Sequence, residues 1–325
     1  MKMLAYSVRE DERAFFKAFG EKYHIEVEMS SDPPTEENAG KIPCDCVSII
    51  TTPVTAKVIE AWHACGVRCI STRTIGYEHI DLKKAGELNI PVTNAPYTPN
   101  TVADYAIMMI LMLLRKMKPI LNRYIGQDFG LEEIRGRELQ QLTVGVVGTG
   151  KIGAAVLRHL SGFGCRLIAS DLYPREELKQ IAEYVTLEDL FARSDVITFH
   201  APATEESFHM VNRESLAQMK DGVVLVNTAR GSLIDTDALI EALETGKVGA
   251  AGLDVVENEQ AIYYNDYKYR PVCHHQMSIL SAMPNVLMTP HTAFFTDQAV
   301  SDMVEHSIAA CAAELTGKPD PYRVS

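Results

Sequence analysis

Residues 142–153, LTVGVVGTGKIG, decide the fold of this chain. An apolar run ends in the pattern Gly-x-Gly-x-x-Gly, a helix-like segment follows over residues 154–160, and a second apolar run over residues 165–170 stops at Asp171. Strand, glycine turn, helix, strand and acid in this order form the context that a dinucleotide-binding fingerprint requires. The pattern predicts a Rossmann βαβ unit. The alternative is a glycine turn of the same shape that holds no ligand.

Each part of this motif has a physical task. Gly148 permits the tight turn, Gly150 lets the backbone approach a pyrophosphate, and Gly153 lets the helix pack close to the sheet. The N-terminus of the helix offers free N–H groups and a partial positive charge to phosphates. Asp171 can hold both hydroxyls of an adenosine ribose and would repel a 2′-phosphate, so the predicted cofactor is NAD rather than NADP.

Composition narrows the class of protein. The 325 residues are 46% hydrophobic and carry a formal net charge of −12, which disfavours nucleic acid and anionic membranes as partners. The seven cysteines are scattered and lack the spacing of a zinc site, as expected for reduced thiols in a cytosol. No apolar run is long enough for a membrane span or a signal peptide. We therefore expect a cytoplasmic enzyme without a metal.

Strands and helices are expected to alternate along both halves of the chain, which implies parallel sheets with crossover helices. Before the glycine motif, strands are expected at residues 3–8, 46–51, 68–72 and 91–93, and helices at 10–21 and 56–65. After Asp171, strands are expected at 196–200, 223–227, 249–255 and 286–289, and helices at 187–192, 212–219, 236–245 and 297–315. Residues 257–281 read as a long irregular insertion.

A break at residues 94–100, which contain two prolines, separates two domains. The predicted fold is α/β, with two Rossmann-like or flavodoxin-like domains and parallel sheets. Residues 100–294 form an NAD-binding domain inserted into a discontinuous substrate domain of residues 1–99 and 295–325.

A helix at residues 101–117 is apolar on nearly every face. It lies between the domains or packs against a second subunit, and we expect a homodimer.

Three polar residues each follow an apolar strand: Arg230, Glu259 and His291. Ligands of open parallel sheets bind at the carboxyl ends of strands, so all three are expected at one crevice. The planar fork of an arginine suits a carboxylate, a histidine can give or take one proton near neutrality, and an adjacent glutamate favours the imidazolium. Each of these residues alone also has an interpretation without a catalytic role. His291 could be a buried histidine, Arg230 an arginine that ends a strand, and Glu259 a solvated acid.

Three segments carry a resemblance to a known family: residues 146–153 (VVGTGKIG), 219–231 (MKDGVVLVNTARG) and 290–293 (PHTA). In this order they resemble the D-isomer-specific 2-hydroxyacid dehydrogenases over nearly the whole chain. Residues 71–81 and 291–296 and the insertion after Glu259 are similar to the D-lactate dehydrogenase branch. Residues 94–99 and 102–105 resemble its vancomycin-resistance members, but these generally lack an acid at the position of Asp171.

The resemblance implies roles for individual residues. Arg230 would hold the carboxylate of a 2-oxo acid and polarise its carbonyl, His291 would donate the proton, and Glu259 would be the partner of His291. The implied substrate-binding residues are Ile75, Gly76, Tyr97 and Phe294. The implied cofactor-binding residues are Gly148, Gly150, Lys151, Ile152, Gly153, Asp171, His200, Ala201, Pro202, Thr228 and Asp254, with Asp254 on the nicotinamide amide.

The predicted function is reduction of pyruvate to D-lactate with NADH. A bulkier 2-oxo acid, such as 2-oxoisocaproate or phenylpyruvate, is the alternative within the same enzyme class. A nucleotide-sensing binding protein is the alternative in a different class, because some corepressors share the fold. Asp171 favours fermentative recycling of NAD over a role in resistance.

Overall fold

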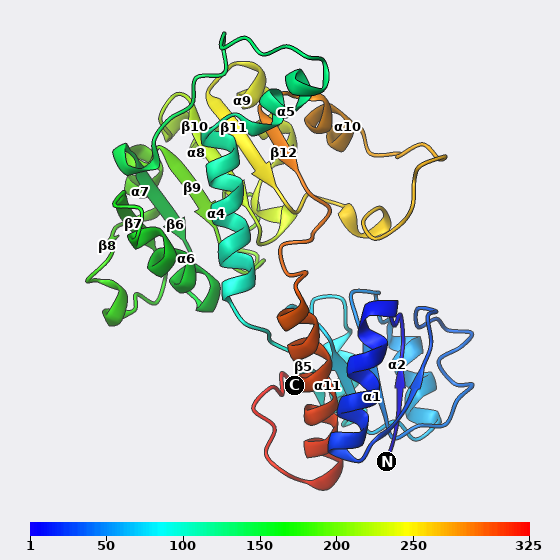
Figure 1. Ribbon diagram of the computed structural model, residues 1–325. Coiled ribbons are helices and arrows are strands. Elements are labelled where there is room, and N and C mark those ends of the chain that lie inside the picture. Colours follow the sequence, from blue (N-terminus) through cyan, green and yellow to red (C-terminus); the bar gives the residue numbers. More distant parts are fainter. The chain divides into compact units, whose positions relative to one another are not determined.

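The computed structural model describes residues 1–325, except for the side chain of Ala261. The chain forms two compact units, which we call unit 1 (Met1–Thr98 with Phe295–Ser325) and unit 2 (Pro99–Phe294). Figure 1 shows that each unit is a sheet with helices packed against it, and that the C-terminal helix belongs to the same unit as the N-terminus.

Unit 1 contains strands β1 (Lys2–Ala5), β2 (Glu26–Met29), β3 (Cys46–Ile49), β4 (Cys69–Thr72) and β5 (Val92–Asn94), helices α1 (Arg13–Tyr23), α2 (Ala56–Ala64), α3 (Leu82–Glu87) and α11 (Asp297–Thr316), and the 3₁₀ turn η1 (Glu10–Glu12). The five strands are parallel, in the order β2-β1-β3-β4-β5, which is the flavodoxin arrangement. Phe16 of α1 and Ile308 of α11 belong to the core on one face of the sheet, and Ile59 and Trp62 of α2 to the core on the other.

Unit 2 contains strands β6 (Thr143–Val147), β7 (Arg166–Ser170), β8 (Glu183–Tyr184), β9 (Val196–Phe199), β10 (Val223–Asn227), β11 (Val248–Leu253) and β12 (Val286–Met288). Its helices are α4 (Asn100–Leu114), α5 (Met117–Ile125), α6 (Lys151–Ser161), α7 (Leu187–Arg193), α8 (Arg213–Gln218), α9 (Thr236–Glu244) and α10 (His275–Ala282), and its 3₁₀ turns are η2 (Leu139–Gln141), η3 (Glu176–Leu178), η4 (Gly231–Leu233) and η5 (Glu259–Ala261).

The seven strands of unit 2 are parallel, in the order β12-β11-β10-β9-β6-β7-β8. Counted from β6, this is the dinucleotide-binding order with one further strand at the edge, and the chain changes direction across the sheet between β6 and β9. Residues of α4 and α6 share one apolar core, and residues of α7 to α10 share another. The predicted α/β class with two parallel sheets is confirmed.

Five helices and strands were not predicted: β2, β8, α3, α5 and α10. Strand β2 is an edge strand with glutamates at alternate positions, so its pattern lacks a buried face. Helix α3 has only six residues, too few to display a period. Helix α10 lies inside the segment that was expected to be irregular throughout, residues 257–281, and continues to Ala282.

The helix expected at residues 101–117 ends earlier, at Leu114. Lys116 adopts a left-handed conformation with φ +50°, which breaks the helix, and α5 begins at Met117. Most of α4 is buried within unit 2, where it packs on α6 and β10, although Met108 is 40% exposed. The apolar surface that remains uncovered therefore lies mainly beyond α4.

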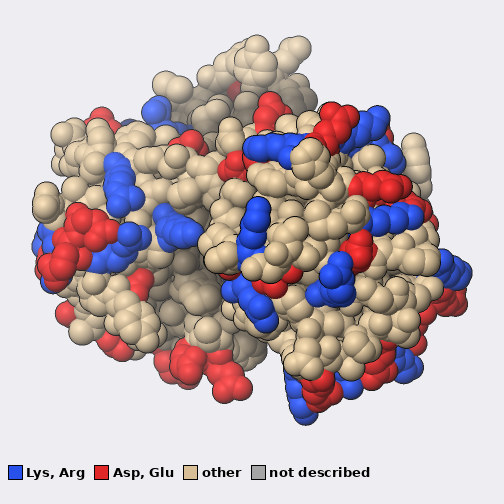
Figure 2. Space-filling view, turned by 90° about the horizontal axis from the view of Figure 1, so that it is seen from below, with Lys and Arg blue, Asp and Glu red and all other residues tan. Residues whose placement is uncertain are grey.

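No helix in the described part of the chain is long and apolar enough to cross a membrane. Acidic and basic side chains are interspersed on the face drawn in Figure 2.

Candidate active site

The glycine turn after β6 has the geometry that close approach to a ligand requires. Gly148 has φ +85°, and a Cβ on Gly153 would lie 1.9 Å from the carbonyl oxygen of Gly148. A Cβ on Gly150, by contrast, would meet no heavy atom within 4 Å. The chain thus leaves open space at the N-terminus of α6, where a pyrophosphate would bind to free N–H groups. Lys151 and Ile152 begin this helix.

Asp171 lies beside the same turn, at the end of β7. Its Oδ2 accepts hydrogen bonds from the N–H and the Oγ1 of Thr149, and its Oδ1 accepts one from Tyr173 N–H. These bonds aim the carboxylate at the glycine turn, where a ribose hydroxyl can add a further hydrogen bond. The residues present therefore fit an adenosine dinucleotide without a 2′-phosphate.

The end of β9 lies next to the glycine turn, because β9 and β6 are the neighbouring strands between which the chain changes direction across the sheet. A Cβ on Gly148 would lie 2.8 Å from the backbone nitrogen of Ala201, so the predicted cofactor residues His200, Ala201 and Pro202 adjoin the glycine turn. His200 Nε2 and Thr198 Oγ1 are 2.9 Å apart, and burial lowers the pKa of His200 to about 3. The imidazole is therefore neutral at physiological pH and adds no charge next to the glycine turn.

The turns after β10 and β11 bring two of the predicted catalytic residues to one place. A Cβ on Gly231 would lie 2.2 Å from the carbonyl carbon of Val256, so the backbone that follows Arg230 almost touches the backbone that precedes Glu259. Arg230 donates from Nη1 to the carbonyl of Ala229, and its own carbonyl accepts from Asn227 Nδ2.

His291 and Glu259 form a direct pair. His291 Nδ1 lies 2.5 Å from Glu259 Oε1, and Glu259 Oε2 accepts from Val256 N–H. Because a carboxylate only accepts, the proton of the pair lies on Nδ1, which leaves Nε2 to exchange a proton with a substrate. The glutamate is 12% exposed and the histidine 26%, so the pair is shielded yet still reachable. A histidine oriented in this way can serve as a general acid and base.

Known proteins resemble this chain over most of its length. Residues 107–293 match the family described as "D-isomer specific 2-hydroxyacid dehydrogenase, NAD binding domain". The chain belongs to this family. The dehydrogenase is 41% identical over 310 residues to an aromatic 2-oxoacid reductase of Clostridium sporogenes, with 94% of this chain and 93% of the relative covered. It is 39% identical over 308 residues to a D-specific alpha-keto acid dehydrogenase of Enterococcus faecium, with 94% of each chain covered.

Among solved structures, a D-lactate dehydrogenase from Treponema pallidum superposes with a TM-score of 0.91 at 32% identity, and both chains are covered completely. The predicted enzyme class, an NAD-dependent oxidoreductase of D-2-hydroxy acids, and the predicted NAD cofactor are confirmed.

Asp254 of this dehydrogenase holds the turn that carries His291. Its buried carboxylate accepts from Thr289 Oγ1 at 2.6 Å, from Thr292 N–H at 2.8 Å and from Ala293 N–H at 2.9 Å. Its backbone carbonyl accepts from His291 N–H, and His291 itself has φ +52°. Burial raises the pKa of Asp254, and these donors oppose the increase. The expected bond between Asp254 and a nicotinamide amide stays a prediction.

Unit 1 carries three of the four predicted substrate residues, on the loops after β4 and β5. The carbonyls of Thr74, Ile75 and Gly76 all accept hydrogen bonds, from Ala95 N–H, Asn94 Nδ2 and Thr74 Oγ1 respectively. Within the described part of the chain, the N–H groups of residues 75–77 donate to no recorded acceptor. This polarity, with carbonyls engaged and N–H groups available, suits an anion. Tyr97 is half-buried on the loop after β5.

Phe294 belongs to unit 2, and its ring centroid lies 6.5 Å from that of His291 in an edge-on arrangement. Tyr264, whose Oη donates to the carbonyl of His291, is not among the residues predicted from the sequence. Tyr264 lies in the insertion, where no periodic pattern could single it out. Thr228, a predicted cofactor residue, has a buried Oγ1 that finds no hydrogen-bond partner among the described residues, which leaves this oxygen available to a ligand.

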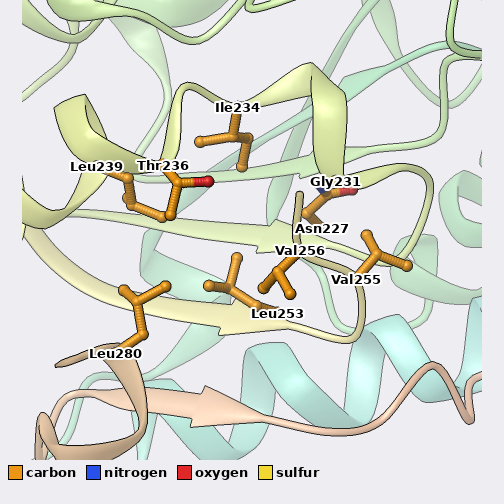
Figure 3. Close-up of a pocket in the computed structure, with 9 residues that line it drawn as sticks. All are labelled: Asn227, Gly231, Ile234, Thr236, Leu239, Leu253, Val255, Val256 and Leu280. Atoms are coloured by element: carbon orange, nitrogen blue, oxygen red, sulfur yellow. The ribbon is translucent and has the colours of Figure 1, made fainter. Parts of the chain in front are cut away.

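A small pocket near these turns is lined by other residues than the predicted catalytic ones. Aliphatic side chains supply most of its lining, among them Leu253 of β11, Leu239 of α9 and Leu280 of α10, and Asn227 and Thr236 add polar groups (Figure 3). Arg230, Glu259 and His291 do not line it. The pocket is thus part of the packing that supports the turns.

Proposed function

We propose that this enzyme reduces pyruvate to D-lactate with NADH. The observation that carries the proposal is the pair of His291 and Glu259, held at the end of β12 with Arg230 on the adjoining turn. When bound, the reduced nicotinamide supplies the hydride to the carbonyl carbon of the substrate. Residues of the protein bind the substrate and donate the proton.

His291 donates its proton from Nε2 to the carbonyl oxygen as negative charge develops there, and takes it back in the oxidation direction. Glu259 holds the ring through Nδ1 and stabilises the imidazolium. Arg230 binds the substrate carboxylate with both arms of its fork and polarises the carbonyl. The N–H groups of Ile75 and Gly76 add donors to the carboxylate, and Tyr97 and Phe294 border the substrate side chain.

The experiment follows the loss of NADH absorbance with pyruvate, phenylpyruvate and 2-oxoisocaproate, and determines the chirality of the product. Pyruvate should have the highest kcat/KM, and the product should be the D-isomer. Likeness to an aromatic 2-oxoacid reductase favours phenylpyruvate as the second candidate. A kcat/KM for phenylpyruvate about tenfold above that for pyruvate would assign the enzyme to bulky substrates, since small changes in pocket shape shift such preferences by about 1–3 kcal/mol.

We infer that the enzyme is a homodimer whose contact includes α5 and the loop after it. Five large apolar side chains there are exposed: Leu121 (49%), Tyr124 (68%), Ile125 (82%), Phe129 (70%) and Leu131 (83%). An exposed apolar cluster of this kind is typical of a protein–protein contact. The interface thus lies next to α4, whose apolar character first suggested it, rather than on α4 alone.

We also propose a cytoplasmic location and a role in fermentation. Scattered cysteines without pairing suit a reducing compartment. The NAD-adapted carboxylate of Asp171 suits recycling of NADH. Growth on a fermentable sugar without a terminal electron acceptor should become dependent on the enzyme, and loss of the gene with no change in D-lactate release would contradict this role.

A further inference from the structure

A cluster of exposed charges follows β7, a few residues after Asp171. Arg175 Nη2 lies 2.7 Å from Glu177 Oε1, and Arg158 Nη2 of α6 lies 4.0 Å from the same oxygen. One carboxylate oxygen thus faces two guanidinium groups.

Three successive hydrogen bonds connect this cluster to Asp171. Arg175 N–H donates to Tyr184 Oη at 3.2 Å, Tyr184 Oη donates to Thr149 Oγ1 at 2.9 Å, and Thr149 Oγ1 donates to Asp171 Oδ2 at 3.0 Å. The backbone of Arg175 is therefore linked, through Tyr184 and Thr149, to the carboxylate that is proposed to face the adenosine ribose. A guanidinium on a long, flexible side chain at this point is within reach of a group on the ribose.

Arginine is the residue that accommodates a 2′-phosphate in NADP-binding proteins, because its fork bonds two phosphate oxygens at once. Arg175 follows the strand that carries Asp171, as such an arginine would, but its guanidinium is paired with Glu177. The hydrogen bonds recorded for Asp171 in the described chain come from Thr149 and Tyr173. Each acid therefore opposes a 2′-phosphate in a different way: Asp171 by repulsion, Glu177 by engaging the arginine.

We propose that Glu177 is a second determinant of the preference for NAD over NADP, because it engages Arg175 and Arg158 and so closes a 2′-phosphate site. This inference rests on the proposed contact between Asp171 and the adenosine ribose. Removal of the Asp171 charge alone leaves the arginines engaged, so it only partly relaxes the preference. Removal of both charges releases Arg175 to bind the phosphate.

The side chains concerned are half-exposed, with 50% exposure for Glu177 and 39% for Arg175. Exposed ion pairs contribute little to folding, so their loss leaves the protein folded. Glu176 provides a matched control, since it is the neighbouring glutamate, is 83% exposed and pairs with Lys179 instead. Glu176→Gln removes the same charge from the same turn without releasing either arginine.

The test compares Glu177→Gln with Glu176→Gln, each in the Asp171→Ser background. Adenosine 2′,5′-bisphosphate is the probe, and its Kd is measured by calorimetry at low salt without any 2-oxo acid. Glu177→Gln should tighten binding about two- to fivefold, the upper part of the range of one exposed charge pair, and Glu176→Gln less than about 1.5-fold. The ratio of kcat/KM for NADPH to that for NADH should follow the same order.

Arg175→Ala in the Asp171→Ser, Glu177→Gln protein should cancel the gain. Equal effects of the two glutamine substitutions, or a gain that survives Arg175→Ala, would overturn the proposal. Failure to reduce pyruvate would contradict the proposed substrate but not this inference, because the calorimetric comparison contains no 2-oxo acid.

Discussion

The two ring nitrogens of His291 have different surroundings. Nδ1 is bound to Glu259, which leaves Nε2 as the nitrogen that can meet a substrate. The carboxylate of Asp254 holds the turn that carries the ring by accepting hydrogen bonds from its N–H groups. Tyr264 of the insertion donates to the backbone carbonyl of His291. The ring and its turn are thereby held by three residues of the segment that follows β11: Asp254, Glu259 and Tyr264.

His291→Gln should lower kcat by about 10²–10⁴, the usual contribution of a general acid, and leave NADH affinity unchanged. Stopped-flow turnover and fluorescence titration of NADH measure the two effects. His63→Gln, an exposed histidine of α2, is the control and should behave as the unmodified enzyme. Retention of more than about a tenth of the turnover, with chemistry rate-limiting, would remove the proton-donor role.

Arg230→Lys keeps the charge but loses the planar fork, so it separates electrostatic from geometric recognition. We expect KM for pyruvate to rise and kcat to fall together, because a point charge cannot grip both carboxylate oxygens. The Kd of oxamate, an isosteric inhibitor, should rise in proportion to KM. Normal oxamate binding by the lysine variant would show that Arg230 does not hold the carboxylate.

His200 should remain neutral in the folded protein down to acidic pH, because burial lowers its pKa to about 3. An unfolded histidine titrates near pH 6.5, so below that pH the unfolded state binds the extra proton. Stability should therefore fall as the pH decreases from about 6.5, and His200→Asn should reduce this dependence in urea denaturation. An NMR titration that shows the ring protonating above about pH 5 would contradict the expectation.

At the scale of elements, the contact between the glycine turn and the first turn of α6 sets the shape of the proposed cofactor site. A Cβ on Gly153 would overlap the carbonyl of Gly148, so any side chain there forces the helix away from β6. A pyrophosphate bound at this turn would then lose hydrogen bonds from the N–H groups at the N-terminus of α6.

Gly153→Ala should weaken NADH binding at least tenfold and destabilise the protein by about 1–3 kcal/mol, as expected for overpacking. Gly162→Ala, at the other end of the same helix, is the control: its added Cβ would lie 3.6 Å from the nearest heavy atom, the carbonyl oxygen of His159. Fluorescence titration and thermal denaturation report the two effects. Equal behaviour of the two variants would mean that the close approach at Gly153 is unimportant.

At the scale of the whole molecule, unit 2 buries two extended cores yet leaves the five apolar side chains of α5 and its loop uncovered. Lys118, which donates to the carbonyls of Ser281, Met283 and Val286, fastens α5 to the rest of unit 2. The exposed cluster is therefore presented on a fixed element, which suits a permanent contact with a second copy of the chain.

Sedimentation at micromolar concentration should show a dimer of the 36.0 kDa chain. Ile125→Glu combined with Leu131→Glu should dissociate it, because two charges would be buried in the contact. Leu172→Glu is the control, since Leu172 is 88% exposed but lies elsewhere, after β7. A single 36.0 kDa species for the unmodified protein would contradict the assembly.

The sequence alone determined the βαβ unit around residues 142–171, the parallel α/β class and the candidates Arg230, Glu259 and His291. These features follow from local requirements: apolar periodicity reports which face is buried, and glycines mark where the backbone must turn or approach closely. Residues that follow parallel strands necessarily meet at one edge of the sheet, which is why the sequence alone groups these three distant side chains.

Only the tertiary structure decided the second set of features: the edge strand β2, the early end of α4, the support of the His291 turn by Asp254, and the engagement of Arg175 by Glu177. Each depends on contacts whose partners are set by packing rather than by period. Asp254 and Thr292 are 38 residues apart, and no local pattern records which carboxylate will lie beneath which N–H group. The order of helices and strands follows from local sequence patterns. Which side chains become hydrogen-bond or ion-pair partners is decided only when the helices pack on the sheets.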